Sequence, residues 1–335
     1  SLYYMNILKD SFGRRFPYIR LSISDVCNFK CGYCLPNGYK IDKSDNRTFI
    51  TKEEIGRLAK ALSELGVSKI RLTGGEPLLR RDLHELVRQL RECSSDLDIA
   101  ITSNGLLLKK QLKKLHDAGL SRVTISLDAL DENIYQSMGD TDASPSIVLE
   151  AIDAVEKIGL PIKVNTVVKK DVNDNQILAM VNEFGPRKIP VRFIEYMDVG
   201  STNDWNLDHV VSAKAMRSLL EQELGPLESN KPLHTSDVAK VYTTPDGWKV
   251  GFIESITNPF CGNCSRARLS ANGSVYTCLV TNHGHDVRGI LRMDGSPEDI
   301  TRAIQSIWIK RSDRYSEERT NQTTKIKVEM SYIGG

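Results

Sequence analysis

The segment Cys27-Asn28-Phe29-Lys30-Cys31-Gly32-Tyr33-Cys34 places three thiols within eight residues, directly after a short apolar stretch. Thiolates are soft ligands that suit iron–sulfur clusters or zinc, and packing alone does not explain such crowding. Three cysteines that hold a four-iron cluster leave one iron open to another ligand. A zinc site and three unrelated core thiols are the alternatives, and the C-x3-C-x2-C spacing favours the cluster.

The composition of the chain is that of a globular protein with a sizeable core. Of its 335 residues, 40% are hydrophobic and 26% are charged, and the formal net charge of +2 gives no reason to expect a nucleic-acid or membrane partner. No apolar run approaches the length of a membrane span, and no signal peptide precedes the first motif. Six of the seven cysteines fall into two tight groups, and only Cys93 stands apart. We therefore expect metal ligands in a reducing, cytoplasmic environment.

Short strands alternate with amphipathic helices from Ile19 to about Met197. The predicted strands are Arg20–Ser24, Lys69–Thr73, Asp98–Thr102, Arg122–Leu127, Ile162–Val167 and Val191–Glu195. The predicted helices are Lys52–Leu65, Arg81–Glu92, Leu107–Ala118, Ile147–Ile158 and Asn175–Phe184, the first opened by a capping box of Thr51 and Glu54. Six such units predict an α/β fold, a partial (βα)6 TIM-type barrel over residues 1–199, with the active site at its mouth.

Polar residues alternate with apolar ones along these strands. One set is apolar, whereas the opposite set contains five cations: Arg20, Lys69, Arg71, Lys163 and Arg192, with Thr102 beside them. A filled barrel interior would be mostly Val, Ile and Leu. Cations at strand ends can also lie at a solvated rim. Five together point to a polyanionic ligand inside the barrel, because Arg and Lys are the usual phosphate binders.

A second group of cysteines lies in residues 200–335, where the alternation of strands and helices stops. We expect an α+β extension with a helix at Ala213–Glu223 and hairpin strands at Val238–Thr243 and Trp248–Glu254. Cys261, Cys264 and Cys278 again provide three thiols for a cluster, although His283 or His285 would complete a Cys3His zinc site. Between these cysteines, Arg266 and Arg268 alternate with Ala267 and Leu269 on a predicted strand. The two guanidinium groups form either a second phosphate clamp or part of a salt-bridged surface strand.

The loop after the second strand contains Gly74-Gly75-Glu76. Glycines at a strand end allow the backbone to approach a ligand closely, although Gly-Gly also marks ordinary turns.

With the first cysteine motif, this loop resembles the radical S-adenosylmethionine (SAM) enzymes. Further motifs are the second cysteine group, the segment Cys264-Ser265-Arg266-Ala267-Arg268 and the terminal Gly334-Gly335. With these motifs the chain is similar to the MoaA family of GTP 3′,8-cyclases, which begin molybdenum-cofactor biosynthesis. The resemblance implies a radical SAM barrel whose first [4Fe–4S] cluster is bound by Cys27, Cys31 and Cys34. It implies a second [4Fe–4S] cluster bound by Cys261, Cys264 and Cys278.

The resemblance also implies roles for other residues. SAM would contact Tyr33, Gly74, Gly75, Glu76, Ser126 and Met197. GTP would contact Arg20, Arg71, Thr102, Lys163, Arg266, Ala267 and Arg268, and the alternation adds Lys69. Arg266, Arg268, Gly334 and Gly335 are the candidate catalytic residues, and we hypothesise that the terminal glycines enter the active site.

The reaction implied by the resemblance is conversion of GTP to 3′,8-cyclo-7,8-dihydro-GTP by a radical generated from SAM. The resemblance leaves room for a flavodoxin- or ferredoxin-type electron donor, for the downstream cyclic pyranopterin monophosphate synthase and for a homodimer. The nearest alternative is a two-cluster radical SAM peptide maturase, which has no need of a cationic lumen. A zinc-binding interaction module and a SAM-dependent methyltransferase without radical chemistry are further alternatives.

Overall fold

The computed structural model describes residues 8–16, 18–34, 49–200, 205–232, 237–281, 283–318 and 327–333. In the first half, six strands alternate with helices. The strands are β1 (Tyr18–Ser22), β2 (Lys69–Thr73), β3 (Asp98–Ser103), β4 (Arg122–Ser126), β5 (Ile162–Val168) and β6 (Val191–Glu195). The helices are α1 (Lys52–Glu64), α2 (Leu83–Cys93), α3 (Leu108–Asp117), α4 (Glu132–Gly139), α5 (Pro145–Ile158) and α6 (Ile177–Phe184).

The second half adds shorter elements. Its strands are β7 (Glu228–Ser229), β8 (Lys240–Thr243), β9 (Lys249–Ile253), β10 (Arg266–Leu269), β11 (Ser274–Tyr276) and β12 (His285–Asp286). Its helices are α7 (Ala213–Leu224), α8 (Arg288–Arg292), α9 (Pro297–Ile309), α10 (Tyr315–Glu318) and α11 (Met330–Ile333). Four 3-10 helices complete the described elements: η1 (Pro77–Leu79), η2 (Asp174–Gln176), η3 (Leu207–His209) and η4 (Cys261–Asn263).

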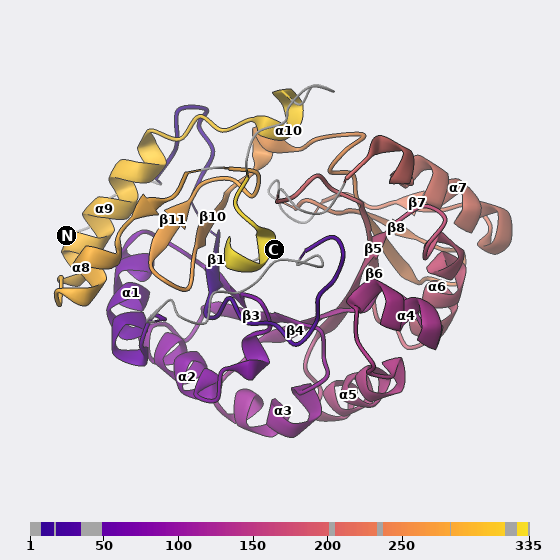
Figure 1. Cartoon of the computed structure of the whole chain (residues 1–335), viewed down its shortest axis with the longest axis horizontal. Helices are drawn as coiled ribbons and strands as arrows, with labels where there is room; N and C mark the ends of the chain where they lie inside the picture. The colour runs from indigo at the N-terminus through magenta and orange to yellow at the C-terminus, as the bar shows by residue number, and fades with distance from the viewer. Residues whose placement is uncertain are drawn as a thin grey trace.

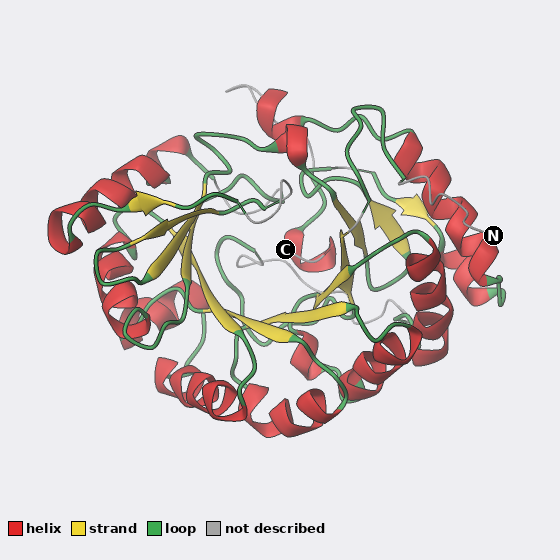
Figure 2. Cartoon of the chain, turned by 180° about the vertical axis from the view of Figure 1, so that it is seen from behind, coloured by secondary structure: helices red, strands yellow, loops and turns green. Residues whose placement is uncertain are grey.

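All these strands belong to one curved sheet with the order β12-β11-β10-β1-β2-β3-β4-β5-β6-β9-β8-β7. Neighbours from β10 through β1–β6 to β9 are parallel, and the outer pairs at both ends are antiparallel. The sheet surrounds a central space and the larger helices cover its outer face (Figures 1 and 2). Within the described part of the chain the end strands β7 and β12 are not paired with each other, so the barrel is partial.

The hydrophobic core lies between the sheet and the outer helices. Leu21, Ile70 and Ile99 occupy neighbouring strands and are almost completely buried, as are Leu58 and Leu86 on the covering helices. Burying one such side chain stabilises the fold by about 1.5–3 kcal/mol. The apolar half of each strand therefore fixes which face turns outward and leaves the polar half for the lumen.

The predicted strands and helices of the barrel are confirmed, with three differences. The strand predicted to end at Ser24 ends at Ser22, because the Ser24 carbonyl oxygen instead accepts a hydrogen bond from Gly75 N in the next loop. Helix α4 was not predicted. Strands β9 and β10 were not expected to continue the barrel sheet, but they pair in parallel with β6 and β1. The capping box is present, with Thr51 N donating to Glu54 Oε2 at 2.8 Å.

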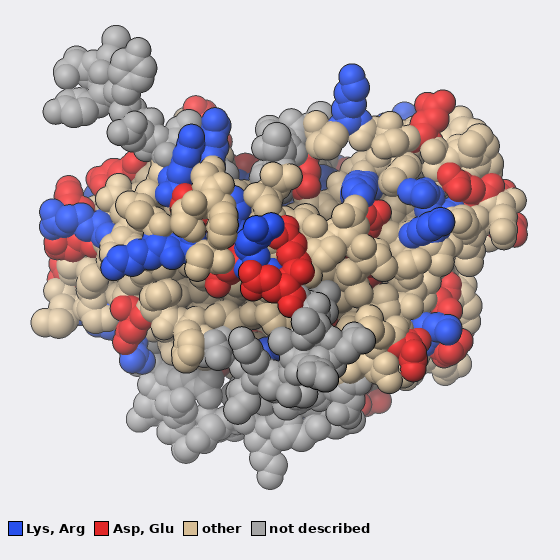
Figure 3. Space-filling model, turned by 90° about the horizontal axis from the view of Figure 1, so that it is seen from above, with Lys and Arg blue, Asp and Glu red and all other residues tan. Residues whose placement is uncertain are grey.

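The surface carries both signs of charge. Figure 3 shows Lys and Arg interspersed with Asp and Glu over the face seen from above. In the described residues, no helix is long and apolar enough to cross a bilayer.

Candidate active site

The first cysteine motif lies in the loop that leaves the carboxyl end of β1. Two contacts anchor this loop to α4: Lys30 N donates to the Gly139 carbonyl oxygen at 2.9 Å, and the Phe29 ring meets Tyr135 edge-on with centroids 5.9 Å apart. The motif also turns back on itself, since Cys34 N donates to the Cys31 carbonyl oxygen. Helix α4, which sequence reasoning missed, therefore supports the loop.

Cys27, Cys31 and Cys34 lie near enough to influence one another's ionisation. Burial raises the pKa of Cys27 to about 11, and burial followed by nearby negative groups raises those of Cys31 and Cys34 further. A metal centre must displace the thiol protons when it binds. Nowhere in the described residues do three Cys, His, Asp or Glu side chains gather around a single metal-ion position. In a cluster each thiolate binds a different iron, so the three free thiols of this loop could bind three irons of a four-iron cluster.

A pocket beside this loop is lined by residues that follow β1, β3 and β4. Cys31 and Tyr33 line it together with Asn104 after β3, Ser126 at the end of β4 and Asp128 two residues later. Tyr33 Oη donates to Asp128 Oδ2 at 2.7 Å, and Asn104 Nδ2 donates to Asn28 Oδ1 at 2.8 Å. Of the predicted SAM contacts, Tyr33 and Ser126 line this pocket. Asn104 and Asp128 were missed, although polar residues that follow parallel strands are a usable signal.

Gly74, Gly75 and Glu76, which are predicted SAM contacts, lie in the loop after β2, and this loop runs beside the cysteine loop. A Cβ on Gly74 would lie 2.2 Å from the Ser24 carbonyl oxygen, and one on Gly75 would lie 2.3 Å from that of Val26. The glycines therefore allow the loops after β1 and β2 to run side by side, with Gly75 N and Glu76 N donating to those two oxygens at 2.8 Å.

Glu76 is buried and joins the β2 loop to β3. Its carboxylate accepts from Leu78 N at 3.0 Å, Ser103 Oγ at 2.8 Å and Asn104 N at 2.9 Å. Burial raises the pKa of Glu76 to about 7 even though these donors oppose the shift. Met197, the remaining predicted SAM contact, lies in the loop after β6 and is not among the residues that line the pocket.

The predicted cationic lumen is centred on Arg71. Its Nε donates to Tyr18 Oη at 2.7 Å, and its Nη1 donates to Thr102 Oγ1 at 2.8 Å and Thr124 Oγ1 at 3.0 Å. Strand register places Arg20 between Arg71 on β2 and Arg268 on β10. Ala267 is fully buried on the other face of β10, so it lies away from the cations that flank it.

The ionisation of these residues reflects a concentration of positive charge. Burial, followed by repulsion from neighbouring cations, lowers the pKa of Arg192 to about 10 and that of Lys163 to about 8. Burial also lowers the pKa of Lys69. The buried Nε atoms of Arg20 and Arg266 have no hydrogen-bond partner among the described residues. Donors of this kind suit an anionic ligand that supplies the missing acceptors.

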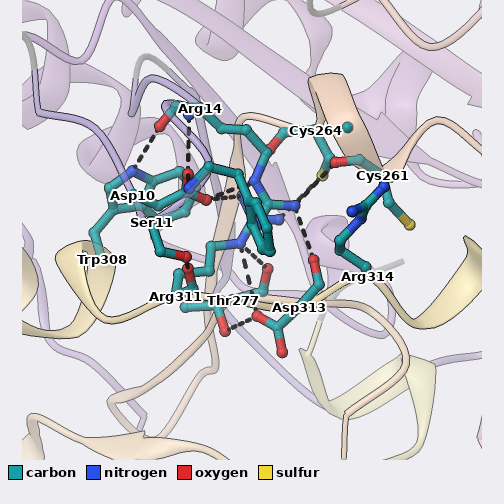
Figure 4. Close-up of polar contacts among 12 residues, drawn as sticks. Asp10, Ser11, Arg14, Cys261, Cys264, Thr277, Trp308, Arg311, Asp313 and Arg314 are labelled. Atoms are coloured by element: carbon teal, nitrogen blue, oxygen red, sulfur yellow. Dashed lines mark hydrogen bonds and ion pairs between the residues drawn. The ribbon is translucent and has the colours of Figure 1, made fainter. Parts of the chain in front are cut away.

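The second cysteine group is held by a buried polar network (Figure 4). Arg14 Nη1 donates to the Cys261 carbonyl oxygen at 2.9 Å, and Arg311 donates to the Cys264 carbonyl oxygen at 2.6 Å and to Cys264 Sγ at 3.4 Å. Both guanidinium groups contact Asp10 Oδ2, at 2.6 and 3.3 Å. The network thus joins the N-terminal turn, η4 and the end of α9.

The electrostatics of this site favour the thiolate form of Cys264. Burial raises the pKa of Cys264, but Arg266 and Arg311 outweigh it and lower the value to about 6. Cys278 lies near Cys264, and burial raises its pKa to about 11. His283 and His285 are exposed, and the described residues contain no group of three Cys, His, Asp or Glu side chains that would hold one metal ion. The three thiols fit a cluster by the same argument as the first group.

The C-terminal tail reaches the centre of the barrel mouth, where α11 lies in Figure 1. Lys327 Nζ donates to Asp198 Oδ2 at 2.9 Å, and Val328 N donates to the Thr281 carbonyl oxygen at 2.9 Å. Ile333 is fully buried. Gly334 and Gly335, two of the predicted catalytic residues, lie outside the described residues.

Family models match both halves of the chain. The Radical SAM superfamily model matches residues 21–184, and the Molybdenum Cofactor Synthesis C model matches residues 189–317. The chain is 43% identical to the GTP 3′,8-cyclase of Staphylococcus aureus strain MRSA252 over 98% of this chain and 99% of the relative. The chain belongs to the GTP 3′,8-cyclase family. The resemblance noted from the motifs is thereby confirmed, and membership of the radical SAM superfamily implies a [4Fe–4S] cluster and SAM.

Solved structures extend the comparison to the fold of this GTP 3′,8-cyclase family member. SuiB of Streptococcus suis bound to S-adenosylmethionine matches with a TM-score of 0.61 and 15% identity, over 87% of this chain and 68% of SuiB. SuiB bound to the precursor peptide SuiA matches with a TM-score of 0.62 and 16% identity, over 90% and 68% of the two chains. At such low identity the likeness supports the partial barrel fold alone.

Proposed function

We propose that the chain converts GTP to 3′,8-cyclo-7,8-dihydro-GTP, the first step of molybdenum-cofactor biosynthesis. The proposal depends on the observation that two features occur inside the same barrel. A three-cysteine loop and its pocket lie at the carboxyl ends of β1, β3 and β4. The lumen contains Arg20 and Arg266, whose Nε atoms have no hydrogen-bond partner among the described residues. The first suits a cluster with SAM, and the second suits a triphosphate.

The residues at the mouth would hold the cofactors. Cys27, Cys31 and Cys34 would bind the first cluster, which with SAM would supply a SAM-derived radical when bound. Tyr33 and Ser126 would contact SAM in their pocket. Gly74, Gly75 and Glu76 would keep the cysteine loop in position through the contacts between the two loops, and Met197 would approach from β6.

The residues of the lumen would hold the substrate. Arg71 has three hydrogen-bond acceptors that orient it in the absence of ligand, so its guanidinium is arranged before substrate binds. Arg20, Lys69 and Lys163 would bind phosphate oxygens beside it. Thr102, Arg266 and Arg268 would complete the site, while Ala267 supports it from the buried face. The tail and sheet would exclude water from the reacting ribose.

Cys261, Cys264 and Cys278 would bind a second [4Fe–4S] cluster, which would supply a binding position for the guanine base. The lowered pKa of Cys264 supports a metal ligand there, because metal binds the thiolate. Arg266 and Arg268 on β10 would connect this cluster to the triphosphate. The paired register of Arg268 with Arg20 and of Arg266 with Tyr18 supports this arrangement.

The tail would bring Gly334 and Gly335 into the active site. The buried contacts of Lys327 and Ile333 support a tail directed into the barrel. Residues without side chains can present backbone groups in a narrow space. Adding one alanine after Gly335 should then reduce turnover, and unchanged turnover would contradict this role.

The proposal extends to the surroundings of the enzyme. The chemistry is compatible with a cytoplasmic location and with a flavodoxin- or ferredoxin-type electron donor. It is also compatible with transfer of product to the cyclic pyranopterin monophosphate synthase and with a homodimer. A two-cluster peptide maturase is the weaker alternative, because a peptide does not need the buried cations of the lumen.

The test is turnover by the anaerobically reconstituted enzyme with SAM, a strong reductant and either GTP or ATP. We expect 5′-deoxyadenosine and a cyclised nucleotide with GTP but not with ATP. The variant Arg71→Ala should lose the stimulation by GTP, whereas Arg187→Ala, which alters a surface arginine bound to Glu156 and Glu183, should retain it. Deoxyadenosine that does not depend on nucleotide would refute the substrate, and absence of SAM cleavage with both clusters loaded would refute the mechanism.

A further inference from the structure

Tyr18 is the only tyrosine on the six barrel strands, and its hydroxyl lies among cations. Its oxygen accepts from Arg71 Nε at 2.7 Å, and Lys69 Nζ lies 5.2 Å from the centre of its ring. Strand register places Tyr18 directly between Lys69 on β2 and Arg266 on β10. The side chain is therefore enclosed by positive groups from three strands.

The hydroxyl proton of Tyr18 has no acceptor among the described residues. The charged groups that act on Tyr18 are all cations: Arg20 on its own strand, Lys69 and Arg71 on β2, and Arg266 on β10. Asp98 on β3, which pairs with Lys69 in the sheet, is engaged by Arg122 at 2.8 Å. A phenol that accepts from a guanidinium and cannot donate is stabilised as its anion.

The direction of the pKa shift of Tyr18 agrees with this geometry. Burial raises the pKa of Tyr18, but the four cations, Arg71 foremost, outweigh it and lower the value to about 6. At neutral pH the phenolate then offsets one of the lumen charges. Without the negative charge of the phenolate, the lumen would contain the same buried cations and one hydrogen-bond acceptor fewer.

We propose that Tyr18 is the internal counter-anion of the substrate-free lumen, and that it takes up one proton from solvent when a triphosphate displaces it from Arg71. The inference rests on the proposed binding of GTP in this lumen. Phosphate oxygens bring several negative charges to the same cations, which disfavours a phenolate beside them. Binding thus exchanges the phenolate for the triphosphate as the partner of Arg71, and Tyr18 becomes a neutral phenol.

The exchange makes triphosphate affinity depend on pH. Below about pH 6 Tyr18 is protonated in both states and binding costs no proton. At higher pH each binding event requires a proton, so the affinity falls by up to about tenfold per pH unit. Lys163 adds its own dependence near pH 8, because its lowered pKa also permits proton uptake on binding. Comparison with Tyr18→Phe isolates the tyrosine, since Lys163 and the ligand's own ionisation are common to both proteins.

The first measurement follows the near-ultraviolet absorbance of phenolate in the anaerobic holoenzyme while inorganic triphosphate, which has no ring to absorb there, is added. At pH between about 7 and 8 we expect the wild type to lose the absorbance of one phenolate, and Tyr18→Phe to show no such loss. Tyr242→Phe is the matched control, because Tyr242 Oη also accepts from an arginine, Arg217 Nη1 at 2.7 Å, but on β8 outside the lumen. Its absorbance loss should equal that of the wild type.

The second measurement is the affinity for inorganic triphosphate and for GTP across the same pH range. The ratio of wild-type to Tyr18→Phe dissociation constants should rise with pH, by up to about tenfold per unit. A ratio independent of pH, or binding without loss of phenolate absorbance, would overturn the role of Tyr18 and leave the substrate site intact. Absence of binding by both triphosphate and GTP would instead overturn the proposed substrate site, and Tyr18's role with it.

Discussion

Arg311 donates from Nη2 to Cys264 Sγ at 3.4 Å while its Nη1 donates to the carbonyl oxygen of the same cysteine at 2.6 Å. Its side chain is only 2% exposed, and it also donates to Asp10 Oδ2 at 3.3 Å. A positive group that both orients a cysteine and donates to its sulfur favours the thiolate form that binds metal. Arg311 is therefore a positioning residue for the proposed second cluster.

The substitution Arg311→Met should impair loading of that cluster. We expect iron to fall from about eight toward about four atoms per chain, with the spectroscopic signal of one cluster retained. Asp10 keeps Arg14 as a partner at 2.6 Å, so the fold should survive. Arg187→Met, which removes a surface arginine, should keep the full iron content. Full iron and unchanged spectra in Arg311→Met would contradict the positioning role.

Gly75 is required where two backbone segments meet. An alanine Cβ there would lie 2.3 Å from the Val26 carbonyl oxygen and 2.9 Å from Cys27 N, and backbone atoms cannot yield as a flexible side chain would. Gly75→Ala should therefore displace the cysteine loop and lower both the iron of the first cluster and SAM cleavage. Gly289→Ala is the control, because its Cβ would meet nothing within 4 Å. Equal iron contents in the two variants would show that the close approach is not needed.

Glu76 should make stability depend on pH. Burial raises its pKa from 4.5 to about 7, so between these values the folded state binds more protons than the unfolded state and stability decreases as pH rises. The full effect is about 3 kcal/mol. Glu76→Gln removes this dependence but leaves one of three backbone and hydroxyl donors without an acceptor, at a cost of about 1–3 kcal/mol.

The deficit of Glu76→Gln in free energy of unfolding should thus be largest at about pH 4.5, decrease as pH rises, and be smallest above about pH 7. Anaerobic denaturant titrations of both proteins at several pH values measure it. A deficit that grows with pH would mean that the pKa of Glu76 in the folded protein lies below 4.5.

The barrel could be predicted from the sequence because each strand and its helix carry their own periodic pattern. Residues Lys69–Thr73 alternate apolar and polar side chains over the span that forms β2, and Thr51 with Glu54 marks the start of α1. The cationic lumen follows from the same alternation. Tyr18 was missed only because β1 was predicted to begin at Arg20. Tyr18 lies two residues before Arg20, so the alternation along the strand places both side chains on the same face of the sheet.

Other parts of the site depend on contacts between distant segments. Arg311 meets the local pair of Asp10 and Arg14 across some 300 residues, and no local pattern marks Arg311 as their partner. Helix α4 is short and largely polar, and its stability comes from packing such as that of Tyr135 on Phe29. The extension of the sheet by β9 and β10 arises in the same way, from long-range pairing.

The tail is fastened by a buried ion pair. The side chains of Lys327 and Asp198 are 8% and 9% exposed, their charged atoms lie 2.9 Å apart, and Tyr315 Oη donates to the same carboxylate at 2.8 Å. Lys327→Met leaves Asp198 buried with one fewer donor, and breaking a buried pair commonly costs about 3–5 kcal/mol. The segment from Val328 to Ile333 directly follows this ion pair, so it should detach more often in the variant.

Hydrogen exchange measures this detachment directly. The Val328 amide, which donates to the Thr281 carbonyl oxygen at 2.9 Å, should exchange faster in Lys327→Met, and turnover with GTP should fall while both clusters remain loaded. Lys52→Met is the matched control, since its ion pair with Glu85 at 3.0 Å is exposed and distant in sequence from the tail. Exchange at Val328 that matches the wild type would mean that Asp198 does not hold the tail. Faster exchange with unchanged turnover would separate tail docking from catalysis and remove the reason to place the terminal glycines in the active site.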